Sequence, residues 1–119
     1  FWANREVLFG GSARAEKLLR RVAQLFAMAH YRASPDDILR ASSDKHYLFL
    51  NINRDEVVCA VEIALEGGMD AQFANKSQRM DHHSGDLIPW TLYKQTLDTA
   101  IVEIKGARIV RIATHPHYQ

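Results

Sequence analysis

The chain has 119 residues, of which 47% are hydrophobic and 24% charged, as in an ordinary globular domain or a piece of a larger one. Its formal net charge of +1 excludes a strong general attraction to nucleic acid or anionic membrane, so any such binding needs a local patch. No apolar run approaches the ~20 residues that span a bilayer, and "FWANREVLFGG" lacks the pattern of a signal peptide. The single cysteine, Cys59, has apolar neighbours that predict a buried side chain, and it fits a reducing, cytoplasmic compartment.

The first half of the chain predicts two helices. In "GGSARAEKLLRRVAQLFAMAHYR", Ser12 is a suitable N-cap for the first of them. Residues that share one helical face are apolar, namely Leu18, Val22, Leu25, Phe26 and Ala29. The sequence Ser34-Pro35-Asp36-Asp37 then starts a second, shorter helix, because proline suits the first helical position and acids suit the positive end of the helix dipole.

The remaining chain predicts strands and one more helix. "HYLFLNI" and "EVVCAVEIAL" form an antiparallel hairpin around the turn "NRDE", and Gly67-Gly68 end it. Residues 69–86 form an insertion or long loop with room for one helical turn. The stretch "LIPWTLYKQTLDTAI" forms one helix that starts near Pro89, with Trp90, Tyr93 and Leu97 facing inward. This order of elements predicts an α+β domain with a mixed sheet.

Residues 107–114 predict the last strand. Ile109, Val110, Ile112 and Ala113 make it apolar on both faces, which favours a central position in the sheet. Its end is either a plain exit from the core or a ligand site, since backbone groups become free where such strands end.

Several polar features have simpler explanations than chemistry. The pairs His82-His83 and His115-x-His117 lack the spacing of zinc ligands, so no metal site is predicted. Asp36-Asp37 is explained by a helix N-terminus. The basic residues of the first helix, Arg14, Lys17, Arg20 and Arg21, either contact RNA phosphates or form a solvated or domain-contacting face.

Three segments occur in order: "MAHYRASPDDI", "GDLIPW" and "GARIVRIATHPHYQ". Together they resemble the GNAT-type acetyltransferase module of the tRNA(Met) cytidine acetyltransferase and RNA cytidine acetyltransferase family. The resemblance spans roughly residues 2–119 and stops at the start of the Gly-rich loop that holds the pyrophosphate of acetyl-CoA. It implies that residues 1–119 are the N-terminal part of a single GNAT-like domain, whose sheet is incomplete here and whose last strand is central in the full family.

The resemblance also implies roles for particular residues. Ile112, Ala113 and Thr114 match the strand positions that contact acetyl-CoA, and Gln119 matches the start of the pyrophosphate loop. His30 matches a histidine implicated in acetyl transfer, and an imidazole is suited to take a proton from the cytosine amine. Alternatively, His30 is only a helix-end residue. Tyr31 either stacks on a base or packs.

The implied activity is transfer of acetyl from acetyl-CoA to the N4 amine of cytidine in tRNA or other RNA. ATP is implied for full-length family members, through a module that this segment lacks. Without the Gly-rich loop we expect an inactive fragment that binds acetyl-CoA weakly, and an open strand edge that favours self-association. The alternative is a non-enzymatic module that binds RNA or a protein through the basic helix. Neither reading predicts a membrane partner.

Overall fold

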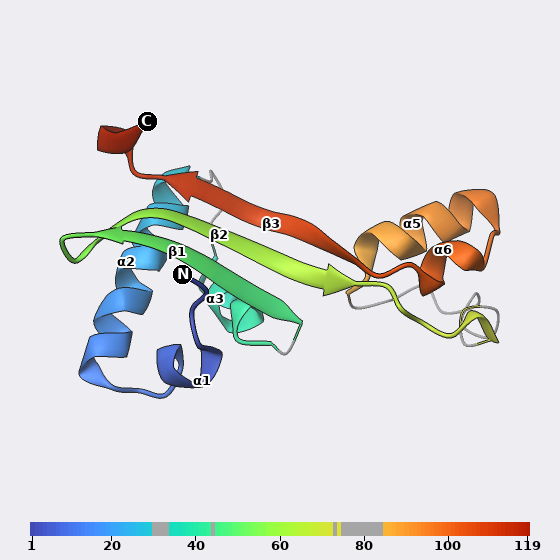
Figure 1. The fold of residues 1–119 in the computed structure, drawn as a ribbon, viewed down its shortest axis with the longest axis horizontal. Coiled ribbons are helices and arrows are strands. Elements are labelled where there is room, and N and C mark those ends of the chain that lie inside the picture. The colour runs from blue at the N-terminus through green and yellow to red at the C-terminus, as the bar shows by residue number, and fades with distance from the viewer. Residues whose placement is uncertain (30–33, 44, 73, 75–84) are drawn as a thin grey trace. The chain divides into compact units, whose positions relative to one another are not determined.

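The computed structural model describes residues 1–29, 34–43, 45–72, 74 and 85–119. Two compact units share the chain (Figure 1). The first comprises Phe1–Ala64 and Ile109–Gln119, and the second comprises Leu65–Arg108. Among the described residues, no helix has the length and apolar character needed to cross a membrane.

The helices of the first unit begin where side chains can cap them. Helix α1 (Arg5–Leu8) is an unpredicted short helix, in which the side chain of Asn4 accepts a hydrogen bond from the Val7 amide. Helix α2 (Ala13–Ala29) begins after Ser12, whose hydroxyl accepts from the Ala15 amide at 3.2 Å, which confirms the predicted N-cap.

The buried face of α2 matches the prediction in part. Val22, Leu25 and Phe26 are buried and Leu18 is half-buried. Ala29 is exposed, so its predicted inward position is wrong; it is the last residue of the helix, beyond the end of the buried stripe.

Helix α3 (Pro35–Ala41) has the predicted start. Pro35 occupies the first turn, and Ser34 and Asp37 form a capping box. The Ser34 amide donates to the Asp37 carboxylate at 2.7 Å, and the Ser34 hydroxyl accepts from the Asp36 amide at 3.3 Å. The side chains of Ser34 and Asp37 thus satisfy two amides at the helix start that would otherwise lack acceptors.

Strands β1 (His46–Asn53), β2 (Glu56–Glu66) and β3 (Gly106–Thr114) form a sheet in the order β1-β2-β3, with neighbouring strands antiparallel (Figure 1). The predicted hairpin is confirmed. Its turn places Arg54 and Asp55 at φ values of 45° and 69°, as a two-residue turn with left-handed geometry requires. A register shift follows, since Ile52 pairs with Val57 whereas Asn51 pairs with Cys59.

The N-terminal residues lie along the outer side of β1. The Ala3 amide donates to the Leu48 carbonyl at 2.8 Å, and the Leu50 amide donates to the Phe1 carbonyl at 2.8 Å. This segment therefore covers the edge of β1, whereas β3 is the opposite edge strand.

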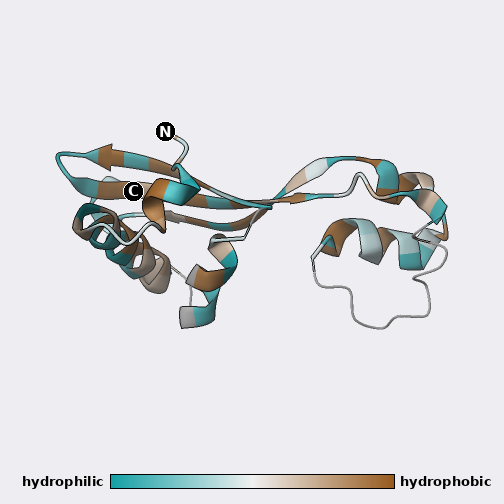
Figure 2. Cartoon of the chain, turned by 90° about the horizontal axis from the view of Figure 1, so that it is seen from below, coloured by the Kyte–Doolittle hydropathy of each residue, from teal (hydrophilic) through white to brown (hydrophobic). Residues whose placement is uncertain are grey.

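The core of the first unit lies between the three helices and one face of the sheet (Figure 2). Residues from both layers meet there: Leu8, Val22, Leu25, Phe26, Ala41, Leu48, Leu50, Val57, Ala60 and Ala113. Tyr47 and Phe49 alternate with the buried β1 residues and are exposed on the other face. Cys59 is half-buried, not buried as predicted, because it points to that less covered face.

Strand β3 differs from the expectation of a central strand that is apolar on both faces. Within the described part of the chain it is an edge strand, and Ile109 and Ile112 are 60% and 56% exposed. These two apolar side chains therefore lie on a surface that the described part of the chain does not cover. The α+β class with an incomplete sheet is confirmed.

The second unit contains α5 (Leu87–Thr96) and α6 (Ala100–Glu103). Trp90 and Tyr93 are buried with Ala74 and Val102, as predicted for the two aromatic residues. Leu97 is 66% exposed, so its predicted inward position is wrong. It takes a φ of 57° and ends α5, which breaks the single expected helix in two.

The predicted end of the hairpin is confirmed at Gly67, which has a φ of +83°. A Cβ there would lie 1.8 Å from the Ile104 carbonyl oxygen, so only glycine fits. Most of residues 69–86 lie outside the described part of the chain; the helical residues at 71, 72 and 74 agree with the expected single turn.

Candidate functional site

The end of β3 directs backbone groups away from the sheet at its outer edge. The His115 amide donates to the Val58 carbonyl at 2.7 Å, so this amide faces β2. Backbone groups alternate along an antiparallel strand. The N–H and C=O of Thr114 and Ile112 therefore face away from β2, while those of Ala113 face it.

Gln119 supports this assignment of directions. Its side-chain amide donates to the Thr114 carbonyl at 3.1 Å, from the short helix η1 (Pro116–Tyr118) that follows β3. The Thr114 carbonyl is thus open to a donor outside the sheet. Ala113 is buried and its methyl group belongs to the core.

Of the two histidines after β3, His115 contacts an acidic residue, Glu56. His115 Nε2 lies 3.6 Å from a Glu56 carboxylate oxygen, and the Tyr118 hydroxyl donates to the other Glu56 oxygen at 3.4 Å. The rings of His115 and His117 lie 4.9 Å apart. Among residues that the structure describes, no three His, Cys, Asp or Glu side chains are placed to hold a metal ion, and His82-His83 lie outside them.

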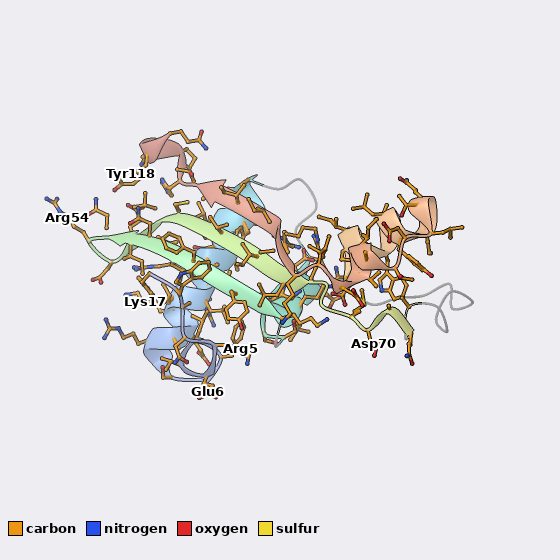
Figure 3. The ribbon with its side chains drawn as sticks, turned by 45° about the vertical axis from the view of Figure 1, so that its right-hand side comes forward. Arg5, Glu6, Lys17, Arg54, Asp70 and Tyr118 are labelled. Carbon is orange, nitrogen blue, oxygen red and sulfur yellow. The ribbon has the colours of Figure 1, made fainter. Side chains whose placement is uncertain are left out.

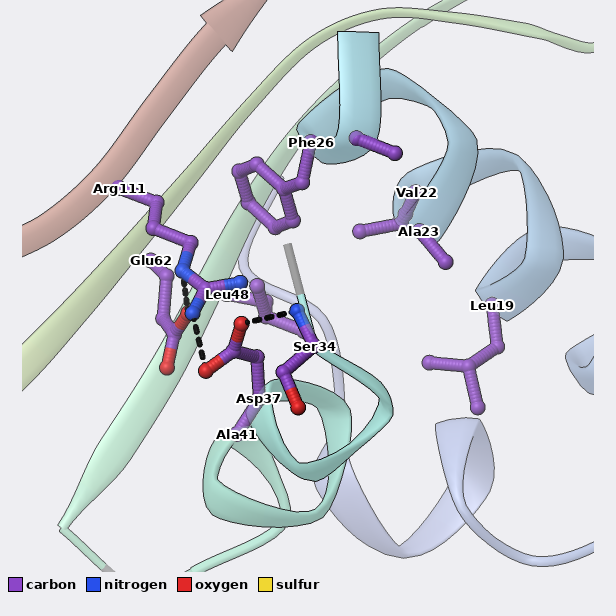
Figure 4. A pocket seen from close by; sticks show the side chains of 11 residues that line it. Leu19, Val22, Ala23, Phe26, Ser34, Asp37, Ala41, Leu48, Glu62 and Arg111 are labelled. Atoms are coloured by element: carbon purple, nitrogen blue, oxygen red, sulfur yellow. Dashed lines mark hydrogen bonds and ion pairs between the residues drawn. The ribbon is translucent and has the colours of Figure 1, made fainter. Parts of the chain in front are cut away.

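A buried charge cluster ties four elements together beneath β3 (Figure 4). Arg111 of β3 contacts Asp37 of α3 at 2.5 Å and Glu62 of β2 at 3.9 Å. Glu62 in turn contacts the Nδ1 atom of His46 on β1 at 2.6 Å. The Arg111 guanidinium also lies 6.0 Å from the centre of the Phe26 ring. The cluster fixes the start of α3 against the three strands.

The cluster borders a cavity of about 320 Å³ between α2, α3 and the sheet. Its walls are mostly apolar side chains of α2, with Ser34, Asp37, Glu62 and Arg111 as the polar exceptions. The Arg111 guanidinium lowers the pKa of Asp37, as does the Ser34 amide, against the opposing effect of burial. Asp37 is therefore an ionised, already paired anchor and not a proton donor at neutral pH.

Sequence analysis missed this cluster, although a signal was present. Glu62 and Arg111 each interrupt an apolar run, "CAVEIAL" and "IVRIAT". Opposite charges inside two apolar strands of one sheet predict a buried pair, because an isolated buried charge is too costly.

The predicted RNA-contacting residues lie on α2. Arg14, Lys17 and Arg20 are exposed and Arg21 is half-buried. None of these four makes a hydrogen bond or ion pair with the described part of the chain. Their charges are thus available for an anion. His30 and Tyr31 lie outside the described residues, so their predicted roles are untested.

Comparison with known proteins agrees with this arrangement. The family model for GNAT acetyltransferase 2 matches residues 21–119. An RNA cytidine acetyltransferase of Dictyostelium discoideum is 38% identical over the whole chain, which covers 12% of that protein. One of Achlya ambisexualis is 33% identical over 98% of the chain, or 35% of that protein.

The human RNA cytidine acetyltransferase is 34% identical over the whole chain, which covers 13% of it. The chain thus spans a small part of the relatives that it matches. The family match and the relatives show that the chain belongs to the GNAT acetyltransferase 2 family, a family of acyltransferase enzymes.

Proposed function

We propose that this chain is part of an acetyl-CoA-dependent RNA cytidine acetyltransferase, and that residues 1–119 are the N-terminal part of its single GNAT-like domain. The observation that carries the proposal is the outward-facing backbone of Ile112 and Thr114, in a chain whose relatives are RNA cytidine acetyltransferases. The single cysteine is consistent with a cytoplasmic enzyme.

The end of β3 fits an extended amide-bearing ligand. Pantetheine carries amides that can pair with a strand edge as another strand would, through main-chain hydrogen bonds. Ile112 and Thr114 offer those groups, Ala113 holds the strand to the core, and Gln119 begins the pyrophosphate loop. Bound acetyl-CoA supplies the activated thioester.

The chain's own residues then accept RNA and move a proton. His30 would take the proton from the N4 amine of cytosine as the nitrogen gains the acetyl group and the thioester C–S bond breaks, and it would return that proton to the departing CoA thiolate. Tyr31 stacks on a base, and the α2 residues Arg14, Lys17, Arg20 and Arg21 bind phosphates. ATP acts, in this proposal, on another part of the full-length enzyme.

Acetyl transfer is tested on the chain extended past Gln119 by the residues that follow it in its gene. RNA incubated with isotopically labelled acetyl-CoA is digested to nucleosides, and labelled N4-acetylcytidine is measured by mass spectrometry. We expect product from the extended chain and a large loss of rate in His30→Gln. Lys94→Gln, at an exposed position on α5, is the surface control and should retain turnover. Transfer that His30→Gln leaves unchanged contradicts the assigned base, and no transfer together with salt-sensitive RNA binding favours the non-enzymatic alternative.

A further inference from the structure

A polar groove of about 420 Å³ lies between the second half of α2 and the β1–β2 turn. The side chains that define it come from three places far apart in sequence. They are Arg21, Gln24 and Met28 of α2, Arg54 and Glu56 at the turn, and His115 at the exit of β3. The groove lies wholly within the first unit of the chain.

Two arginines reach this groove without a partner in the described part of the chain. Neither Arg21 nor Arg54 makes a hydrogen bond or ion pair there. Two acidic residues also border the groove: Glu56 contacts His115 and Tyr118, and Asp55 makes no ion pair in the described part of the chain. Figure 3 shows the Arg54 side chain extending from the tip of the hairpin. The groove therefore presents guanidinium groups to an anion.

Arg54 occupies a position that suits another residue type. Its φ of 45° lies in the left-handed region, where asparagine and glycine are preferred in two-residue hairpin turns. A larger L-residue there costs about 1–2 kcal/mol. Such a cost at a surface turn indicates that the arginine side chain has a function, because the backbone preference of arginine does not favour this position.

The groove continues a line of cations along α2. Arg14, Lys17 and Arg21 are spaced by three and four residues, so they share one side of the helix. The rise of 1.5 Å per residue places Arg14 about 10 Å from Arg21 along the axis. A row of this length fits the repeated phosphates of a polynucleotide better than the phosphates of one small molecule.

We propose that Arg54, together with Arg21, binds a phosphodiester of the single-stranded RNA substrate, which makes the hairpin turn a second RNA contact beside α2. The inference rests on the proposed function. Guanidinium groups bind phosphate oxygens through paired hydrogen bonds. His115 borders the groove, but its Nε2 faces Glu56 and its Nδ1 accepts from the His117 amide, so the two arginines supply the donors. Met28 of α2 also lines the groove.

The test is the salt dependence of RNA binding by the wild-type chain and Arg54→Asn. Asparagine keeps the turn because it tolerates positive φ, so the thermal midpoint should not fall. Lys94→Gln removes the same charge from an exposed position on α5 and serves as the control. Binding of a fluorescent, cytidine-containing single-stranded oligoribonucleotide is followed by anisotropy over a range of salt concentrations.

We expect Arg54→Asn to weaken binding about fivefold and to reduce the slope of log K against log salt by about 0.7, the value for one lost single-strand phosphate contact. Lys94→Gln should leave the slope unchanged. Equal slopes for wild type and Arg54→Asn overturn the groove proposal, as does an absence of RNA binding by the wild type.

A parallel titration with adenosine 3′,5′-bisphosphate tests the other source of phosphate. Arg54→Asn should leave its affinity unchanged. A loss confined to this nucleotide would assign the groove to the cofactor and overturn the RNA proposal. Acetyl transfer by the extended chain is measured separately, so failure of the groove and failure of the enzymatic function are distinguishable.

Discussion

Replacing Arg111 by methionine should destabilise the protein strongly, because it removes the cation from a buried cluster. The side chains of Asp37 and Glu62 are only 8% and 2% exposed, and Arg111 contacts both. Removing one partner of a buried ion pair costs about 3–5 kcal/mol. Asp37 keeps its hydrogen bond from the Ser34 amide and Glu62 keeps His46, so we expect the lower end, about 3 kcal/mol.

Urea denaturation followed by circular dichroism at neutral pH measures this loss in the free energy of unfolding. Methionine preserves the length that packs near Phe26, and Arg20→Met provides an exposed control that should change stability by less than about 0.5 kcal/mol. The total free energy of unfolding of a domain of this size is typically only about 5–15 kcal/mol. A loss below about 1 kcal/mol in Arg111→Met, the value of a surface pair, would refute the reasoning.

Three further outcomes follow from the same structure. The pKa of Asp37 is lowered in the folded state, so ionised Asp37 stabilises the fold above its unfolded pKa of about 3.9, and this stabilisation is lost as pH falls through the folded pKa. Asp37→Asn should remove that part of the acid sensitivity in melting curves. An unchanged pH profile would argue against the ion pair with Arg111. Gly67→Ala should lower the free energy of unfolding by about 3 kcal/mol or more in the same urea assay, because the added methyl group would clash with Ile104. Gly11→Ala has open space around it and should cost only the backbone strain of about 1–2 kcal/mol. Equal losses in the two variants would contradict the contact. The open edge of β3 should support self-association that Ile112→Lys reduces in light scattering, and a monodisperse wild-type monomer would count against it.

Local chemistry made much of the first unit predictable. Ser12 and the Ser34-Pro35-Asp36-Asp37 sequence placed two helix starts, and the alternation of residues 46–65 placed the hairpin. These signals act over a few residues, so they survive without knowledge of the tertiary fold.

The errors arose at the end of α5 and along β3. The left-handed conformation of Leu97 ends α5. A local signal for this break was present but not used: Thr96 and Asp98 are poor helix formers, and their side chains accept hydrogen bonds from the amides of Asp98 and Ala100. The apolar residues of β3 predicted a covered central strand, yet Ile112 is exposed in the described structure. An apolar residue favours burial, but its hydrophobicity does not identify the neighbour that would bury it.

The family resemblance predicted the part of the candidate site that lies on β3. The parts that depend on contacts between residues far apart in the sequence were not predicted. Ile112, Ala113 and Thr114 were chosen from the resemblance, and the alternation of β3 gives Ile112 and Thr114 outward backbone groups. The Arg111 cluster and the Arg54 groove depend on residues separated by many positions, which only the folded chain brings together.

The central claim is that the outer backbone of β3 binds acetyl-CoA. Calorimetric titration of acetyl-CoA into the chain, and into the chain extended past Gln119, tests it most directly with a pair of variants. Thr114→Pro removes the outward-facing N–H without removing a hydrogen bond to β2, whereas Thr114→Ala keeps that N–H. The account predicts that the extended chain and its Thr114→Ala variant bind acetyl-CoA and that Thr114→Pro binds it at least about tenfold more weakly. Equal binding by both variants, or no binding by the extended chain, would contradict the account.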